Sequence, residues 1–100
     1  SRDVIRVHQD PSALDGIAWN AKTYTATATD GKVSLYGVNG SGLAHNLHVV
    51  DADGNDLATP LDLPSRGADG TIELELAPGE YRVICKIPGH TTMDSKLIIK

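Results

Sequence analysis

Residues 80–93 read EYRVICKIPGHTTM and carry the only cysteine of the chain, Cys85, and its only methionine, Met93. His90, one of four histidines, lies between them. A thiolate, an imidazole and a thioether are soft ligands, and copper is the metal that best fits this mixture. The stretch therefore predicts a metal-binding loop, with the rest of the chain as its scaffold.

Each of these three side chains also has an ordinary interpretation. A lone cysteine on the inner face of a strand usually acts as a small hydrophobe, and a lone methionine usually fills the core. A histidine in a Pro-Gly turn is often just a surface residue. The joint spacing Cys-x4-His-x2-Met at the end of an expected strand favours a site over three coincidences.

A copper site of the blue type needs a second histidine, because it has two histidines and a cysteine in one plane with a weak axial methionine. His45 and His48 are the candidates. Strand alternation places His45 on the same face as Leu47 and Val49, which look like core residues, and His48 on the opposite, outer face. We therefore predict His45 as the ligand. His8 has no supporting motif, so we interpret it as a surface histidine.

The dominant hydrophobic period of the chain is two, which indicates strands. We expect strands at residues 3–8, 23–29, 32–38, 45–50, 71–76, 81–86 and 96–100, with a short edge strand between 57 and 69. Asp30-Gly31 predicts a tight turn, and residues 10–15 could form one short helical turn. About seven to eight short strands at this spacing predict an all-β antiparallel sandwich.

Length and composition bound the class of protein. One hundred residues predict a single domain, 1–100, in which residues 1–16 form the N-terminal strand and a connecting segment. A net charge of −4 argues against a nucleic-acid partner. A single cysteine excludes an internal disulfide. The chain starts with Ser1 and shows no signal peptide, so we expect a mature form or an excised domain.

Over roughly residues 17–100 the chain resembles the cupredoxins, the plastocyanin-like single-domain type 1 copper proteins. The resemblance implies a Greek-key β-sandwich with one type 1 copper ion near one end. The matching features are His45-Asn46 opening a strand after a glycine-rich loop, Gly79–Tyr81 leading into the strand that ends at Cys85, and Ile87–His90 followed by Met93.

Carried over position by position, the resemblance assigns the ligands: His45, Cys85 and His90 in the plane, and Met93 on the axis. Asn46 matches the position after the first ligand, where its side chain ties the two ligand loops together. The ligand loop departs from the usual family pattern, because only two residues, Thr91 and Thr92, separate the second histidine from the methionine.

The resemblance also implies a function, that of an electron carrier rather than an enzyme. A monomer would pass single electrons between redox partners such as a respiratory complex, a cytochrome or a copper enzyme. The expected place is the periplasmic or extracellular side of a membrane, with any anchor outside this fragment. The expected docking patch is formed by Pro88, Gly89, His90, Gly42 and Leu43.

Other interpretations remain open at this point. The same ligands could serve a copper-binding or copper-delivery module, or a cupredoxin domain of a larger copper enzyme. An enzyme would need a second copper site, for which only His8 and His48 remain. A metal-free sandwich used for adhesion or binding would require the spacing of the four predicted ligands to be accidental.

Overall fold

The computed structural model describes residues 4–8, 19–87, 89 and 93–100, and these residues contain strands but no helix. No helix that could cross a membrane is therefore found in this part of the chain. The strands are β1 Val4–Val7, β2 Thr23–Ala26, β3 Lys32–Val38, β4 His45–Val50, β5 Leu61–Leu63, β6 Asp69–Glu75, β7 Gly79–Ile84 and β8 Asp94–Ile99.

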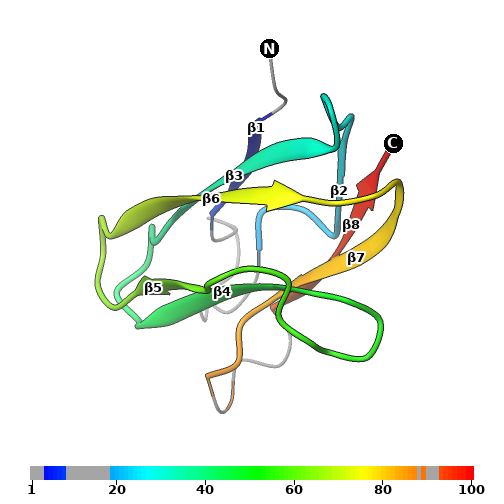
Figure 1. Cartoon of the computed structure of the whole chain (residues 1–100). Coiled ribbons are helices and arrows are strands. Elements are labelled where there is room, and N and C mark those ends of the chain that lie inside the picture. Colours follow the sequence, from blue (N-terminus) through cyan, green and yellow to red (C-terminus); the bar gives the residue numbers. More distant parts are fainter. Residues whose placement is uncertain (1–3, 9–18, 88, 90–92) are drawn as a thin grey trace.

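The strands form two packed sheets (Figure 1). One sheet has three strands in the order β1-β3-β6, and the other has five in the order β2-β8-β7-β4-β5. Strands β3 and β6 lie over β4 and β7 in Figure 1, so the inner faces of the two layers enclose the core. The all-β sandwich predicted from the sequence is confirmed.

The pairing is mixed rather than wholly antiparallel as expected. Strands β3, β4, β5, β6, β7 and β8 pair antiparallel, whereas β1 pairs in parallel with β3 and β2 in parallel with β8. Both exceptions are edge strands. Neither is joined to its partner by a tight hairpin, so each can reach its sheet in the parallel direction.

The expected bounds of two strands, 32–38 and 45–50, match the structure, and the predicted short edge strand is β5. Strand β2 ends at Ala26 instead of Thr29, because Thr29 already pairs with Lys32 across the turn between the two sheets. Asp30 and Gly31 have φ angles of 54° and 77°, as a type I′ turn requires. The helical turn expected at 10–15 lies outside the described residues.

The core follows from the alternation along the strands, because every second side chain points between the sheets. Each fully buried aliphatic side chain stabilises the fold by about 1.5–3 kcal/mol relative to an exposed one. The fully or almost fully buried members include Val33, Leu35, Leu47, Val49, Leu63, Leu74, Val83 and Leu97.

A pair of facing glycines lets the sheets approach closely at one end of the sandwich. Gly37 of β3 and Gly70 of β6 are cross-strand partners. A Cβ on Gly37 would lie 2.9 Å from Leu47 Cδ1 and 3.1 Å from Leu61 Cδ1, and one on Gly70 would lie 2.6 Å from Leu61 Cδ2. Side chains of β4 and β5 therefore fill the space that these glycines leave.

We expect Gly37→Ala to lower the free energy of unfolding by about 1–3 kcal/mol, because the added methyl overpacks this contact. Gly79→Ala is the matched control, since the nearest atom to a Cβ added at Gly79 would be 3.8 Å away. Urea unfolding measures both variants. Equal stability of Gly37→Ala and the unsubstituted protein would contradict this expectation and show that Leu47 and Leu61 can move aside without lowering the free energy of unfolding.

Candidate metal centre

Three strand ends meet at one end of the five-stranded sheet. Because β4 and β8 each pair antiparallel with β7, the start of β4, the end of β7 and the start of β8 lie together. His45 is the first residue of β4, Cys85 follows β7, and Met93 precedes β8. The structure thus brings three of the four predicted ligands to the same edge of the sandwich.

All three side chains are turned inward. His45 is 1% exposed, Cys85 4% and Met93 0%. The backbone N–H of Cys85 donates to the carbonyl of Met93 over 3.1 Å, which continues the pairing of β7 with β8 past the strand ends. A thiol and a thioether eight residues apart in the sequence are therefore buried on neighbouring segments.

The register between β4 and β7 places His45 near Cys85. His48 pairs with Ile84 and Val49 with Val83, so one further step sets Cys85 opposite Leu47. His45 then becomes the diagonal neighbour of Cys85 on the same inner face. Such neighbours have their backbones about 7–8 Å apart, within reach of a long or aromatic side chain.

The Nε2 atom of the His45 imidazole contacts a hydroxyl of the preceding loop. Nε2 lies 2.8 Å from Oγ of Ser41, while Nδ1 is buried. Histidines that bind metals usually engage a second partner through the other ring nitrogen. Together with the soft donors of Cys85 and Met93, this arrangement fits a copper ion.

The sequence does not predict that Ser41 and Asn39 hold His45, because both lie in a stretch that reads as a loop. Asn39 is 0% exposed, and its side chain bonds the carbonyls of Leu43 and Leu63. A hydroxyl four residues before a predicted ligand is the only sequence signal of this contact, and it is a weak one.

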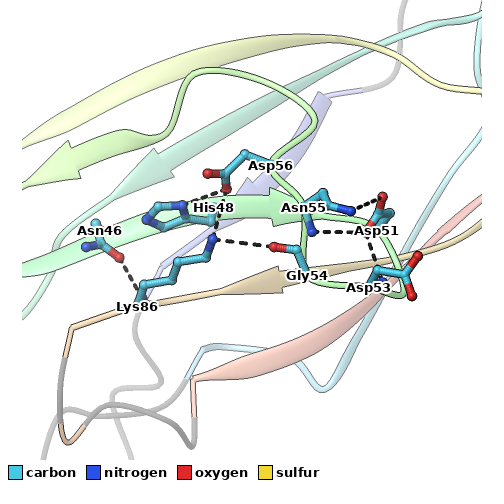
Figure 2. A network of polar contacts seen from close by, with 8 residues as sticks. All are labelled: Asn46, His48, Asp51, Asp53, Gly54, Asn55, Asp56 and Lys86. Atoms are coloured by element: carbon cyan, nitrogen blue, oxygen red, sulfur yellow. Dashed lines mark hydrogen bonds and ion pairs between the residues drawn. The ribbon is translucent and has the colours of Figure 1, made fainter.

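His48 lies on the opposite face of β4 from His45, as the alternation predicts. It is not freely exposed, however, since only 12% of its side chain is accessible. Its Nδ1 lies 2.8 Å from Oδ1 of Asp56, which also lies 3.5 Å from Nζ of Lys86 (Figure 2). His48 is therefore held in a surface network and does not point toward Cys85 and Met93.

Asn46 joins the two segments that carry ligands. Its Oδ1 accepts a hydrogen bond of 2.8 Å from the backbone N–H of Lys86, the residue after Cys85 (Figure 2). The contact fastens β4 to the chain just beyond β7. The further step, that Asn46 stabilises a copper-bound cysteine, stays a prediction.

The remaining predicted site residues are placed only in part. His90 and Pro88 lie outside the described residues. Gly42, Leu43 and Gly89 are exposed, and Leu43 has 42% of its surface accessible. Within residues 4–8, 19–87, 89 and 93–100, no three His, Cys, Asp or Glu side chains form a metal-binding group.

We expect Asp56→Asn to flatten the pH dependence of stability in acid. The hydrogen bond with His48 is the main cause that lowers the pKa of Asp56; burial opposes it, and the charges of His48 and Lys86 add to it. A lowered folded-state pKa gives stability that is present above the unfolded value of about 3.9 and is lost as pH falls through the folded value.

Urea unfolding between about pH 3 and pH 6 measures this dependence. In a His48→Ala background, Asp56→Asn should change the slope much less, because the main cause of the shift is gone. Identical slopes for the unsubstituted protein and Asp56→Asn would contradict the assignment.

No family model matches the chain, and no curated protein sequence matches it. Solved structures do match. The dithionite-reduced auracyanin of Roseiflexus castenholzii has a TM-score of 0.78 at 18% identity, with 100% of this chain and 98% of that chain covered. Auracyanin A, a "blue" copper protein of Chloroflexus aurantiacus, also has a TM-score of 0.78 at 18% identity, covering 97% and 98%.

A third similar structure is the azurin Az-iso2 of Methylomonas sp. strain J, with a TM-score of 0.73 at 13% identity and coverage of 100% and 99%. Auracyanins and azurins are cupredoxins. The likeness extends over almost the whole of each chain, although few residues are identical. The arrangement of the two sheets and the strand ends described above is therefore the cupredoxin fold.

Proposed function

We propose that this protein is a blue copper electron carrier that binds one copper ion through His45, Cys85, His90 and Met93. The observation that carries the proposal is the burial of an imidazole, a thiol and a thioether at one end of a cupredoxin fold. Isolated, each side chain has an ordinary structural explanation. Their convergence from three strand ends is difficult to explain by packing alone.

The residues would provide a rigid cage. His45 is fixed by the pairing of β4 with β5 and by Ser41. Cys85 is fixed by its backbone bond to Met93, and the next residue, Lys86, donates its backbone N–H to the side chain of Asn46. A bound copper ion would supply the one-electron redox chemistry. A cage that moves little between the two oxidation states suits an electron carrier.

The exposed residues beside this end form a candidate docking surface. Gly42, Leu43 and Gly89 are accessible, and Leu43 is one of the few large apolar side chains exposed in the described part of the chain. With Pro88 and His90 they would make a small, weakly polar patch. Such a patch suits brief contacts with a redox protein, since electron-transfer encounters bury little surface.

The proposed partners are a respiratory complex, a cytochrome or a copper enzyme, and the proposed location is the periplasmic or extracellular side of a membrane. The protein would itself carry electrons and catalyse no reaction. Delivery of Cu(I) by the same residues is the main alternative. The two functions differ in the expected behaviour of Cu(II), which the following experiment uses.

Titration of the purified protein with Cu(II) should produce an intense thiolate-to-copper charge-transfer band and a matching EPR spectrum. Cys85→Ser should abolish the band because it removes the thiolate, and His45→Ala should weaken or open the site. His48→Ala is the matched control. It should keep the band, because His48 lies on the outer face and bonds Asp56.

The absence of any charge-transfer band in the folded, unsubstituted protein would refute the blue copper site. Colourless uptake of copper followed by ready release to a chelator would favour delivery over electron transfer. A larger effect of His48→Ala than of His45→Ala would place the ligand on the other face of β4.

A further inference from the structure

Asn39, directly after β3, is hydrogen-bonded through both its backbone and its side chain. It is 0% exposed, its backbone N–H donates to Ala68 over 2.8 Å, and its carbonyl accepts from Gly67 over 2.8 Å. Its Nδ2 donates to the carbonyls of Leu43 at 2.7 Å and Leu63 at 2.8 Å. Because only the NH₂ group can donate to two carbonyls, the amide orientation is fixed and Oδ1 points the other way.

The fixed amide oxygen determines what Ser41 can do. Oδ1 of Asn39 lies 2.9 Å from the backbone nitrogen of Ser41 and 3.0 Å from its Oγ. Serine has a single hydroxyl proton. Of its two acceptors besides His45, Oδ1 of Asn39 at 3.0 Å is closer than the carbonyl of Leu43 at 3.4 Å. When the proton is donated to Asn39, Oγ offers only lone pairs to the N–H of Leu43 at 3.3 Å and to Nε2 of His45 at 2.8 Å.

This arrangement gives a partner to each atom that takes part in these contacts. Oδ1 of Asn39 accepts two hydrogen bonds, the hydroxyl of Ser41 donates one and accepts two, and His45 donates from Nε2. The reverse arrangement, in which Ser41 donates to His45, removes one hydrogen bond from the buried amide oxygen of Asn39. Buried polar groups are costly to leave incompletely bonded, so the first arrangement is favoured.

We propose that Asn39 and Ser41 form a relay that holds His45 as its Nε2–H tautomer, with the lone pair on the buried Nδ1. The inference rests on the proposed copper site and names the two residues that hold the ring of His45 there. Either neutral tautomer of an imidazole carries one ring lone pair, and the relay places it on Nδ1 before a metal binds. Ser41 is thus a positioning residue that acts through His45.

The test begins with the metal-free, ¹⁵N-labelled protein at about pH 8, where an ordinary imidazole is neutral. Long-range ¹H–¹⁵N correlations of the ring should show His45 protonated on Nε2, with the signal assigned by its loss in His45→Gln. In Ser41→Ala the His45 signals should shift toward a mixture of tautomers. Ser41→Thr keeps a hydroxyl and should restore the Nε2–H form.

Affinity for Cu(I), measured by competition with a chelator, provides the second readout. Loss of such a partner of a metal-binding histidine typically costs about 10–100-fold in affinity, so Ser41→Ala should lose that much and Ser41→Thr much less. Ser34→Ala is the matched control, since the hydroxyl of Ser34 bonds the carboxylate of Glu73. Both residues lie in the three-stranded sheet, whereas His45 lies in the five-stranded sheet. It should change neither readout.

A protonated Nδ1 on His45 in the unsubstituted, metal-free protein would overturn the relay, and so would a Ser41→Ala variant with an unchanged tautomer. These measurements need no copper. A protein that shows the Nε2–H form but binds no copper would leave the relay standing and refute the proposed function. A protein that binds copper but shows His45 protonated on Nδ1 when metal-free would refute the relay and leave the proposed function standing.

Discussion

The antiparallel pairing of β4, β7 and β8 is the constraint that brings His45, Cys85 and Met93 to one end of the sandwich. It brings the start of one strand, the end of the next and the start of the third to a common edge. Side chains alternate along a strand, so a shift of one residue in the β4 register would exchange His45 for Asn46 on the inner face. The hydrogen bond from the backbone N–H of Lys86 to the side chain of Asn46 links β4 to the chain beyond β7 and opposes such a shift.

Hydrogen bonds, more than apolar packing, define the loop before β4. Burying the amide of Asn39 and the imidazole of His45 would be unfavourable without partners, because water no longer solvates them. The loop supplies those partners from its own backbone and from Ser41. A hydrogen-bonded polar loop can therefore carry the exposed Leu43 and still hold the buried His45 two residues later.

The sequence predicted the features that depend on alternation. The inward direction of His45 and the outward direction of His48 follow from parity along one strand, and the bounds of β3 and β4 follow from clear turn signals beside them. The parallel edge strands could not be predicted, because period two does not reveal which strand is the neighbour.

Contacts between residues far apart in the sequence could not be predicted either: the bond from Asn39 to Leu63 spans 24 positions and that from Lys86 to Asn46 spans 40. Asparagine and serine beside glycine look like ordinary turn residues, since they are frequent in turns for local reasons.

His45 and His48 illustrate how a single strand gives two histidines different chemistry. His45 contacts Ser41 through Nε2, whereas His48 contacts Asp56 through Nδ1. The nitrogen nearer the backbone is thus engaged at the surface in His48, while in His45 the outer nitrogen is engaged and the nearer one is buried. Parity along β4 selects the face, and the partner of each ring selects the nitrogen. Both selections agree with the proposal that His45, and not His48, is the copper ligand.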